Sequence, residues 1–362
     1  MEKPARPGRP DSGSFERAPF IVFWETTRAC DLVCRHCRAD AVPNRDPRDL
    51  DSDEAFRLLD DIGEMGAPVV VLTGGDPAKR TDLIEIVRHG ASIGLRMALT
   101  PSATPLMTRD LLLRLRDAGL ARIALSLDGA SAESHDRFRG VPGSYDRTFD
   151  ILAAAREIGL TTQINTTVTT SNHSQVEDIA AQIGRLDIEL WSVFFVVPTG
   201  RARGTDLLPA DVAESILERL AAIGETSDFD LKTTEAPHFR RVLLERKVPI
   251  GDVRGVADGI GRAPRGVNDG RGIVFVSHLG EIFPSGFMPI HCGNVRRDSL
   301  ASVYRKHPLF RSLRDPDALL GKCGICEFRR ICGGSRARAY ATTGDPLGEE
   351  PSCAYLPGKW TP

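Results

Sequence analysis

Residues 20–37 read FIVFWETTRACDLVCRHC, an apolar run that passes directly into three closely spaced cysteines. The run at Phe20–Trp24 is rich in β-branched and aromatic side chains, which predicts a buried strand. Five similar runs follow it, and helix-like stretches separate them. This order predicts an α/β fold with a parallel sheet and helices outside it, curled by right-handed crossovers into a partial (β/α)6 TIM-like barrel.

The remaining strands of this barrel are expected at Pro68–Leu72, Leu95–Leu99, Arg122–Leu127, Thr162–Val168 and Leu190–Val197. The helices are expected at Asp53–Met65, Thr81–Ile93, Thr108–Ala118, Tyr145–Ile158 and Ser174–Leu186, where apolar residues recur at helical spacing. Ser52 or Asp53 should open the first helix, and Gly66, Gly94, Gly119 and Gly159 should end four of them. Functional groups of such a barrel gather at the C-terminal ends of its strands.

The composition indicates a cytoplasmic protein of about two domains. The 362 residues include 47 basic and 49 acidic side chains, so a net charge of −2 predicts no general attraction to nucleic acid or to a membrane surface. No apolar run is long enough to span a bilayer. The charged, proline-rich residues 1–19 lack the apolar stretch of a secretory signal and read as a disordered leader.

Changes of pattern along the chain suggest the domain boundaries. After the leader, residues 20–204 form the expected barrel, and residues 205–272 form a linking helix and loop. Residues 273–362 form a smaller, cysteine-rich domain that opens with a hairpin of Ile273–Ser277 and Glu281–Pro284.

The chain holds eight cysteines, and clustered cysteines in a reducing compartment point to metal ligation. Cys30, Cys34 and Cys37 follow the first strand with the spacing C-x3-C-x2-C. Three thiolates can hold a [4Fe–4S] cluster and leave one iron open to another ligand. A zinc knuckle or buried free cysteines are the alternatives.

Glycines and an acid follow the second strand, at Gly74, Gly75 and Asp76. Glycine lets a ligand approach the backbone closely, and the carboxylate can bind a cationic amine. The alternative is an ordinary loop.

Polar residues also follow the fourth and fifth strands. Ser126 and Asp128 share one side of their strand, which suits ribose hydroxyls or a ligand carboxylate, and Asn165 lies on the next strand. Arg139 can clamp a carboxylate through two hydrogen bonds. A turn and a solvated run of charges are the alternatives.

The tail carries a second set of four cysteines, at Cys323, Cys326, Cys332 and Cys353. Four thiolates can complete a [4Fe–4S] cluster or hold a zinc ion. Cys292 is left over, and we expect it to be a small buried apolar residue. The nearby Arg336 and Arg338 could stabilise cluster charge, bind substrate carboxylates or lie in a solvated helix start.

Taken together, these motifs resemble those of the radical S-adenosylmethionine (SAM) superfamily over roughly residues 20–200. The cysteine triplet with His36, the Gly-Gly-Asp-Pro loop and the Ser-Leu-Asp-Gly strand end carry the resemblance. It implies that the triplet holds a [4Fe–4S] cluster whose open iron chelates SAM, and that reductive cleavage of SAM produces a 5′-deoxyadenosyl radical that abstracts a substrate hydrogen. The implied SAM contacts are Gly74, Gly75 and Asp76 for the amino group, Ser126 and Arg139 for the carboxylate, and Asp128 or Asn165 for the ribose or nearby polar groups. Asp76 is one methylene shorter than the Glu that is commoner in the family.

The tail resembles a SPASM/twitch extension, the auxiliary-cluster domain of many radical SAM enzymes. Ser285 and Arg336 stand where the full SPASM pattern has cysteines. The resemblance therefore implies one auxiliary [4Fe–4S] cluster, held by Cys323, Cys326, Cys332 and Cys353.

The expected activity is that of a radical SAM oxidoreductase or maturase. Similar radical SAM proteins of the haem and pyrroloquinoline quinone pathways suggest a tetrapyrrole or a peptide as substrate, the latter presented by a separate leader-recognition protein. A low-potential electron donor such as flavodoxin or ferredoxin is the expected partner. The alternative class is a non-catalytic iron–sulfur or zinc protein acting as redox sensor or scaffold. No residue stands out as a catalytic acid or base.

Overall fold

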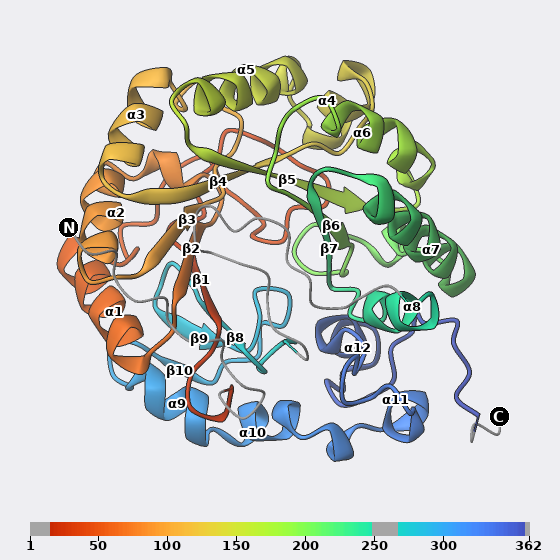
Figure 1. Cartoon of the computed structure of the whole chain (residues 1–362). Coiled ribbons are helices and arrows are strands. Elements are labelled where there is room, and N and C mark those ends of the chain that lie inside the picture. Colours follow the sequence, from red (N-terminus) through yellow and green to blue (C-terminus); the bar gives the residue numbers. More distant parts are fainter. Residues whose placement is uncertain (1–14, 248–266, 359–362) are drawn as a thin grey trace, which may run out of the picture.

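The computed structural model describes residues 15–247 and 267–358, and a sheet of ten strands organises them (Figure 1). The strands are β1 (Ile21–Glu25), β2 (Val69–Thr73), β3 (Arg96–Leu99), β4 (Leu120–Ser126), β5 (Thr161–Val168), β6 (Leu190–Phe195), β7 (Asp230–Thr234), β8 (Ile273–Val276), β9 (Glu281–Phe283) and β10 (Gly293–Asn294). Their order in the sheet is β10-β9-β8-β1-β2-β3-β4-β5-β6-β7. All pairs from β8 through β1 to β7 are parallel, and β9 and β10 continue the sheet in antiparallel fashion.

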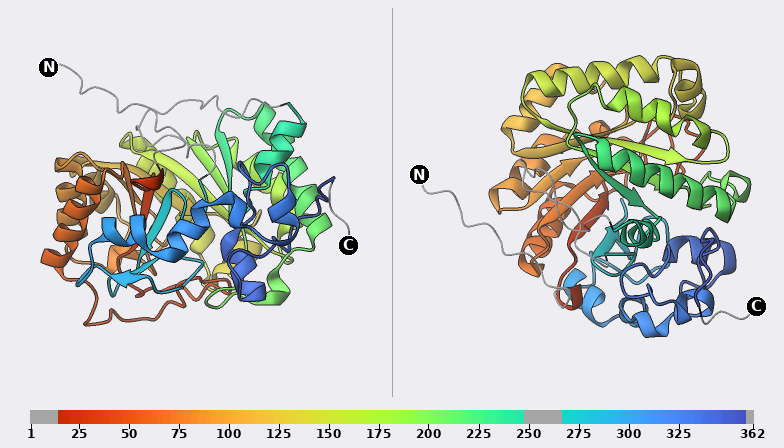
Figure 2. Two further views of the ribbon diagram at one scale, coloured as in Figure 1. Left: turned by 90° about the horizontal axis from the view of Figure 1, so that it is seen from below. Right: turned by 45° about the vertical axis from the view of Figure 1, so that its right-hand side comes forward.

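Helices cover the outside of the curved sheet, and the C-terminal helices lie beside its open edge (Figures 1 and 2). They are α1 (Ser52–Met65), α2 (Leu83–Ser92), α3 (Arg109–Asp117), α4 (Ala132–Arg139), α5 (Ser144–Glu157), α6 (Val176–Ile183), α7 (Ala210–Thr226), α8 (Phe239–Glu245), α9 (Leu300–Lys306), α10 (Pro308–Arg314), α11 (Gly321–Ile325) and α12 (Arg336–Thr343). The predicted partial barrel with a C-terminal extension is confirmed. No helix within the described ranges is long and apolar enough to cross a membrane.

Local sequence signals explain most of these elements. In α1 the side chains of Leu58, Leu59 and Ile62 are buried, as the helical spacing of apolar residues predicts. The helix begins at Ser52, as expected, and Asp51 before it is the N-cap, which forms a capping box with Glu54.

Two elements of the barrel were not predicted. Strand β7 reads DLKTT, and only Leu231 of it is buried, so it lacks the apolar run that marks the other strands. Helix α4 reads AESHDRFR and buries only His135 and Phe138. Its polar sequence looked like a turn or a solvated run of charges, whereas the capping residue Ser131 starts a regular helix.

Part of the expected leader is ordered. Phe15 is 2% exposed, and its carbonyl oxygen accepts a hydrogen bond from the Tyr304 hydroxyl at 2.7 Å. Glu16 pairs with Arg314 of α10 at 3.1 Å. Residues 15–19 are therefore anchored to the C-terminal helices, and residues 1–14 lie outside the described residues.

The sheet continues across the expected domain boundaries. Strand β8, which opens the cysteine-rich segment, pairs in parallel with β1. The expected linking segment contains β7 and α8 besides its helix α7, and its glycine-rich part falls largely on residues 248–266, outside the described residues. The boundaries at residues 204 and 272 thus remain predictions, while the two parts share one sheet.

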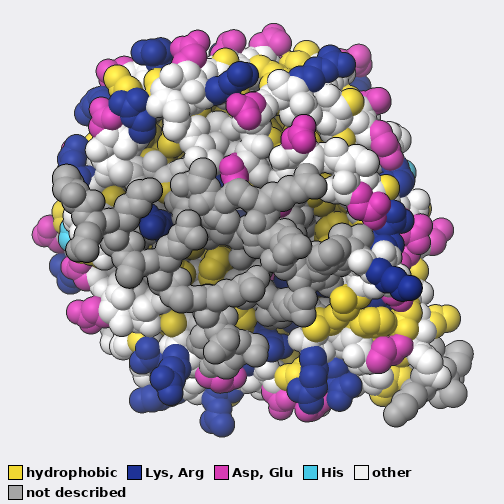
Figure 3. Space-filling view, viewed as in Figure 1, with side chains coloured by type: hydrophobic (Ala, Val, Ile, Leu, Met, Phe, Trp, Pro, Cys, Tyr) yellow, Lys and Arg dark blue, Asp and Glu magenta, His cyan; other side chains and the backbone are white. Residues whose placement is uncertain are grey.

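The surface is of mixed charge. On the face shown in Figure 3, Lys and Arg side chains are interspersed with Asp and Glu side chains, in line with the net charge of −2. Hydrophobic surface gathers at the lower right of this view. Neither sign of charge dominates this face.

Candidate functional site

The loop after β1 brings the three N-terminal cysteines together. Cys30 and Cys34 are buried, and Cys37 is half-buried in the same small apolar cluster. The Cys30 N–H donates to the Val42 carbonyl at 2.8 Å, which closes the base of the loop. The structure therefore assembles the predicted triplet at the C-terminal end of the first strand.

The glycines after β2 let a second loop approach this one. The Gly75 N–H donates to the Thr27 carbonyl at 2.8 Å. A Cβ atom at Gly75 would lie 2.5 Å from the carbonyl oxygens of both Arg28 and Ala29, and one at Gly74 would lie 2.2 Å from that of Thr27. Only glycine permits this approach. The pair thus positions the backbone that leads into Cys30.

Asp76 serves the same loop with its side chain. The carboxylate is fully buried and accepts hydrogen bonds from the Ala78 N–H at 3.1 Å, the Ser102 N–H at 3.3 Å and the Thr104 hydroxyl at 2.8 Å. The Ser102 hydroxyl in turn lies 3.2 Å from the Cys30 sulfur. Burial raises the pKa of Asp76. The structure places this carboxylate behind the loop, where it holds Ser102 against the cysteine.

Asp128 and Arg139 form a buried ion pair at the end of β4. The Asp128 Oδ2 and Arg139 Nη2 atoms are 2.5 Å apart, and Asp128 has no exposed side-chain surface. Burial opposes ionisation, but the Arg139 guanidinium lowers the pKa of Asp128 below its usual value. Arg139 also reaches the Cys34 sulfur at 3.7 Å. Helix α4 thus delivers a guanidinium to the cysteine loop, and Asp128 orients it.

A polar pocket opens beside this loop, between the ends of β2, β3 and β4 and the helices α4 and α5. Of the expected contact residues, Gly74, Gly75, Ser126 and Arg139 line it. Asp76 and Asp128 lie behind it, and the Asn165 side chain accepts a hydrogen bond from Gln163 on β5 at 2.7 Å. Sequence reasoning missed the polar lining residues Thr73, Thr100, Ser102, His135, Ser144 and Thr148. No motif marks these residues, because they meet only in the folded chain.

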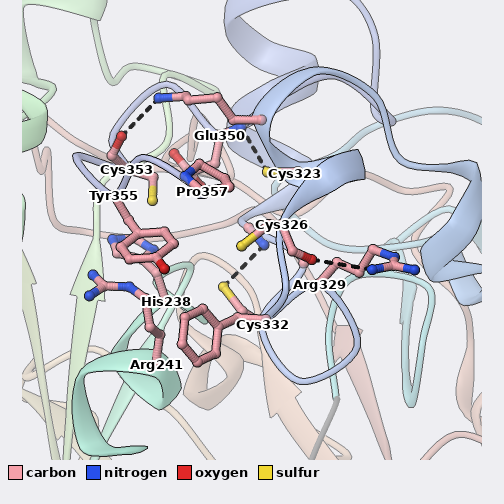
Figure 4. A pocket seen from close by; sticks show the side chains of 14 residues that line it. His238, Arg241, Cys323, Cys326, Arg329, Cys332, Glu350, Cys353, Tyr355 and Pro357 are labelled. Atoms are coloured by element: carbon pink, nitrogen blue, oxygen red, sulfur yellow. Dashed lines mark hydrogen bonds between the residues drawn. The ribbon is translucent and has the colours of Figure 1, made fainter. Parts of the chain in front are cut away.

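The four tail cysteines line a second pocket (Figure 4). Cys323 lies on α11, Cys326 directly follows that helix, and Cys332 and Cys353 come from later loops. Backbone N–H groups face two of the sulfurs, from Gly334 to Cys332 at 3.5 Å and from Glu350 to Cys323 at 3.4 Å. Burial raises the pKa of Cys332 to about 12. Binding a metal here would therefore release protons from these thiols.

Arg336 and Arg338 are both buried. Their burial excludes a solvated helix start and leaves no free surface on either side chain for a substrate carboxylate. Arg336 is 1% exposed; it donates to the Gly348 carbonyl at 2.6 Å, and its Nη2 atom lies 3.6 Å from the Cys323 sulfur. Arg338 is also 1% exposed and pairs with Glu350 at 2.9 Å. Of the three expected roles, only the stabilisation of cluster charge is left. Arg336 lies close enough to the Cys323 sulfur to fill it.

Cys292 lies apart from both sets, as expected for a small buried residue. It is 9% exposed, packs in the main core, and its thiol donates to the Ile290 carbonyl at 3.4 Å. It does not line either pocket among the described residues.

Both sets of thiols adjoin a pocket. Within residues 15–247 and 267–358, no three His, Cys, Asp or Glu side chains converge on the position of a single metal ion. The four tail thiols line one pocket, and four thiolates can hold a [4Fe–4S] cluster or a zinc ion. The first triplet adjoins a polar pocket that can take an organic ligand.

Comparison with known proteins supports this interpretation. Residues 24–183 match the family model described as the radical SAM superfamily. An AdoMet-dependent heme synthase from Methanosarcina barkeri is 40% identical over 344 residues, which cover 94% of this chain and 98% of that protein. A PqqA peptide cyclase from Rhodopseudomonas palustris is 30% identical, covering 94% of this chain and 88% of that protein.

Among solved structures, Streptococcus suis SuiB bound to the precursor peptide SuiA has a similar fold. Its TM-score is 0.72 at 17% sequence identity, and the match covers 94% of this chain and 76% of that chain. At this identity the likeness concerns the fold alone.

Proposed function

The chain belongs to the radical SAM superfamily, and on that premise we propose that this enzyme acts on a carboxylate-bearing iron tetrapyrrole in haem formation. The observation that carries the proposal is the polar pocket beside the three-cysteine loop, together with the 40% identity to a haem synthase along nearly the whole chain. Enzymes of this family use a [4Fe–4S] cluster and SAM. When bound, the cluster would supply one electron that cleaves SAM, and this cleavage would produce a radical that abstracts a hydrogen atom from the substrate.

The first cluster would be held by Cys30, Cys34 and Cys37. Their loop is rigid, because the glycines after β2 and the Ser102 hydroxyl support it from one side. Arg139 beside Cys34 brings a positive charge to the sulfurs and to the pocket. Arg139 would hold the SAM carboxylate at the pocket, and the backbone at Gly74 and Gly75 would hold its amino group.

The auxiliary cluster would be held by the four tail cysteines. The cavity between them, the two backbone N–H groups and the Arg336 guanidinium fit a negatively charged group. An electron carrier such as flavodoxin or ferredoxin would supply the reducing electron.

Unpaired arginine atoms beside the cysteine loop support a substrate with carboxylates. Arg28 precedes Cys30 by two residues, and the backbone N–H of Arg201 donates to the Cys37 carbonyl at 2.9 Å. The buried Nε atoms of both, and Nη2 of Arg201, have no hydrogen-bond partner among the described residues, while Nη2 of Arg28 pairs with Asp40 at 3.4 Å. Buried donors of this kind are normally satisfied, and a guanidinium matches a carboxylate in geometry.

The first test is anaerobic incubation of the reduced, reconstituted protein with SAM and iron coproporphyrin. We expect 5′-deoxyadenosine and a tetrapyrrole of lower mass, both by mass spectrometry. Wild-type protein should contain about eight irons, and Cys34→Ala and Cys332→Ala about four each. Cys292→Ser should keep all of them. Unaltered tetrapyrrole in the presence of 5′-deoxyadenosine would contradict the substrate assignment.

A second test concerns the arginines. Arg201→Gln should raise the KM for the tetrapyrrole while the iron content stays constant, and the exposed Arg137→Gln should change neither. A peptide is the second candidate substrate, supported by the 30% identity to a peptide cyclase. An Arg201→Gln enzyme with unaltered KM, together with turnover of a peptide, would favour it.

A further inference from the structure

His238 stands at the wall of the tail-cysteine pocket. It directly precedes α8 and has no exposed surface. The ring lines the same pocket as Cys323, Cys326, Cys332 and Cys353, and Figure 4 shows it on the side of α8 with Arg241 and Tyr355. The ring of Phe195 lies edge-on to it at a centroid distance of 6.2 Å. His238 is therefore a fully buried polar group in the wall of this pocket.

Neither ring nitrogen of His238 has a hydrogen-bond partner among the described residues. This is unusual, because an imidazole always carries at least one N–H donor and buried polar groups are normally paired. His135, another fully buried histidine, shows the ordinary case. Its Nδ1 accepts from the Asp128 N–H at 3.1 Å, and its Nε2 lies 3.2 Å from the Ser144 hydroxyl. The bare nitrogens of His238 thus point to a missing partner.

The charged neighbours of His238 are already engaged with other groups. The Glu350 carboxylate binds Arg338 and accepts from the Ser335 N–H at 2.7 Å. The Arg241 guanidinium pairs with Glu214 and Glu245. The ring borders the pocket that the four thiols line.

We propose that the His238 ring donates a hydrogen bond to the auxiliary [4Fe–4S] cluster, at a cluster sulfide or a cysteine sulfur. This inference rests on the auxiliary cluster proposed above. Hydrogen bonds to the sulfurs are one of the factors that set the potential of such clusters. Because reduction adds negative charge to the cluster, the donor stabilises the reduced form more than the oxidised form. His238 therefore raises the reduction potential and acts as a tuning residue, not as a ligand.

The test is a redox titration of full-length protein followed by electron paramagnetic resonance. All samples carry Cys34→Ala, so that the auxiliary cluster alone is observed, with about four irons. His238→Leu removes the donor, His238→Gln retains an N–H donor, and Phe195→Leu changes the packing of the ring without touching a donor. We expect His238→Leu to lower the equilibrium constant for reduction of the cluster about tenfold. This corresponds to a fall of about 59 mV in the reduction potential for one electron. His238→Gln should recover part of this fall, and Phe195→Leu should match the parent.

Three outcomes would overturn the role of His238. The potential of His238→Leu could equal that of the parent, or His238→Gln and His238→Leu could fall equally, which would indicate packing alone. Loss of the four irons in His238→Leu would make the histidine a ligand instead of a donor. By contrast, an iron-free Cys34→Ala parent would refute the auxiliary cluster itself, so the two proposals fail in different ways.

Discussion

Replacing Arg338 with methionine should destabilise the folded protein by about 3–5 kcal/mol, the usual cost of breaking a buried ion pair by removing one partner. Arg338 and Glu350 are each 1% exposed and 2.9 Å apart. The guanidinium also donates to the carbonyl oxygens of Phe195 at 3.1 Å and Val196 at 3.2 Å, at the end of β6. One side chain thereby joins the cysteine-rich tail to the barrel.

The magnitude follows from what Arg338→Met leaves behind. Glu350 would keep hydrogen bonds from the Ser335 and Ser352 N–H groups but lose its counter-charge in a buried environment. A loss of 3–5 kcal/mol is a large share of the roughly 5–15 kcal/mol that stabilises a typical protein. Since the Glu350 N–H faces the Cys323 sulfur at 3.4 Å, the tail pocket should loosen as well.

The assay is denaturant unfolding followed by circular dichroism, with iron analysis of the same samples. Arg338→Met should shift the midpoint to lower denaturant and lose iron from the tail site. Adding Glu350→Gln to Arg338→Met should restore part of the stability, because no buried charge is then left alone. The matched control is Arg137→Met, whose ion pair with Glu133 is exposed and contributes little. If Arg338→Met unfolds at the same midpoint as this control, the reasoning is wrong.

Three further predictions concern the barrel. Gly75→Ala should lower the iron content of the first site, because its Cβ would lie 2.5 Å from two carbonyl oxygens, whereas Gly204→Ala has open space and should not; equal iron in both would contradict the loop geometry. Arg139→Lys should weaken SAM binding about tenfold in equilibrium dialysis, because lysine cannot replace the planar guanidinium, and undiminished affinity would remove Arg139 from the SAM site. Burial raises the pKa of both Glu235 and Asp269, so the folded state holds more protons than the unfolded state above their ordinary values. The free energy of unfolding should then fall as the pH rises above the ordinary pKa of a carboxyl group. In Glu235→Gln the denaturation midpoint should depend less steeply on pH; a variant with the wild-type slope would show that Glu235 does not cause this dependence.

Much of the barrel could be predicted because its signals are local. Apolar runs such as Leu190–Phe195 and helices such as Ser52–Met65 show their period within a dozen residues. The cysteine spacing is equally local, and it located both sets of thiols. Strand β7 was not predicted because its pairing with β6, and not a run of apolar side chains of its own, makes it a strand.

The roles of the polar residues were decided by the tertiary structure. The sequence by itself determined which acids and arginines follow each strand, but not which group each side chain would meet. Asp76 accepts a hydrogen bond from Thr104, 28 positions further along the chain, and Asp128 pairs with Arg139, 11 positions further along. His238 carries no motif at all, and only its bare nitrogens in the wall of the pocket single it out. Burial and hydrogen bonding depend on residues distant in sequence, so the chemistry of a side chain is known from the sequence while its task is set by the fold.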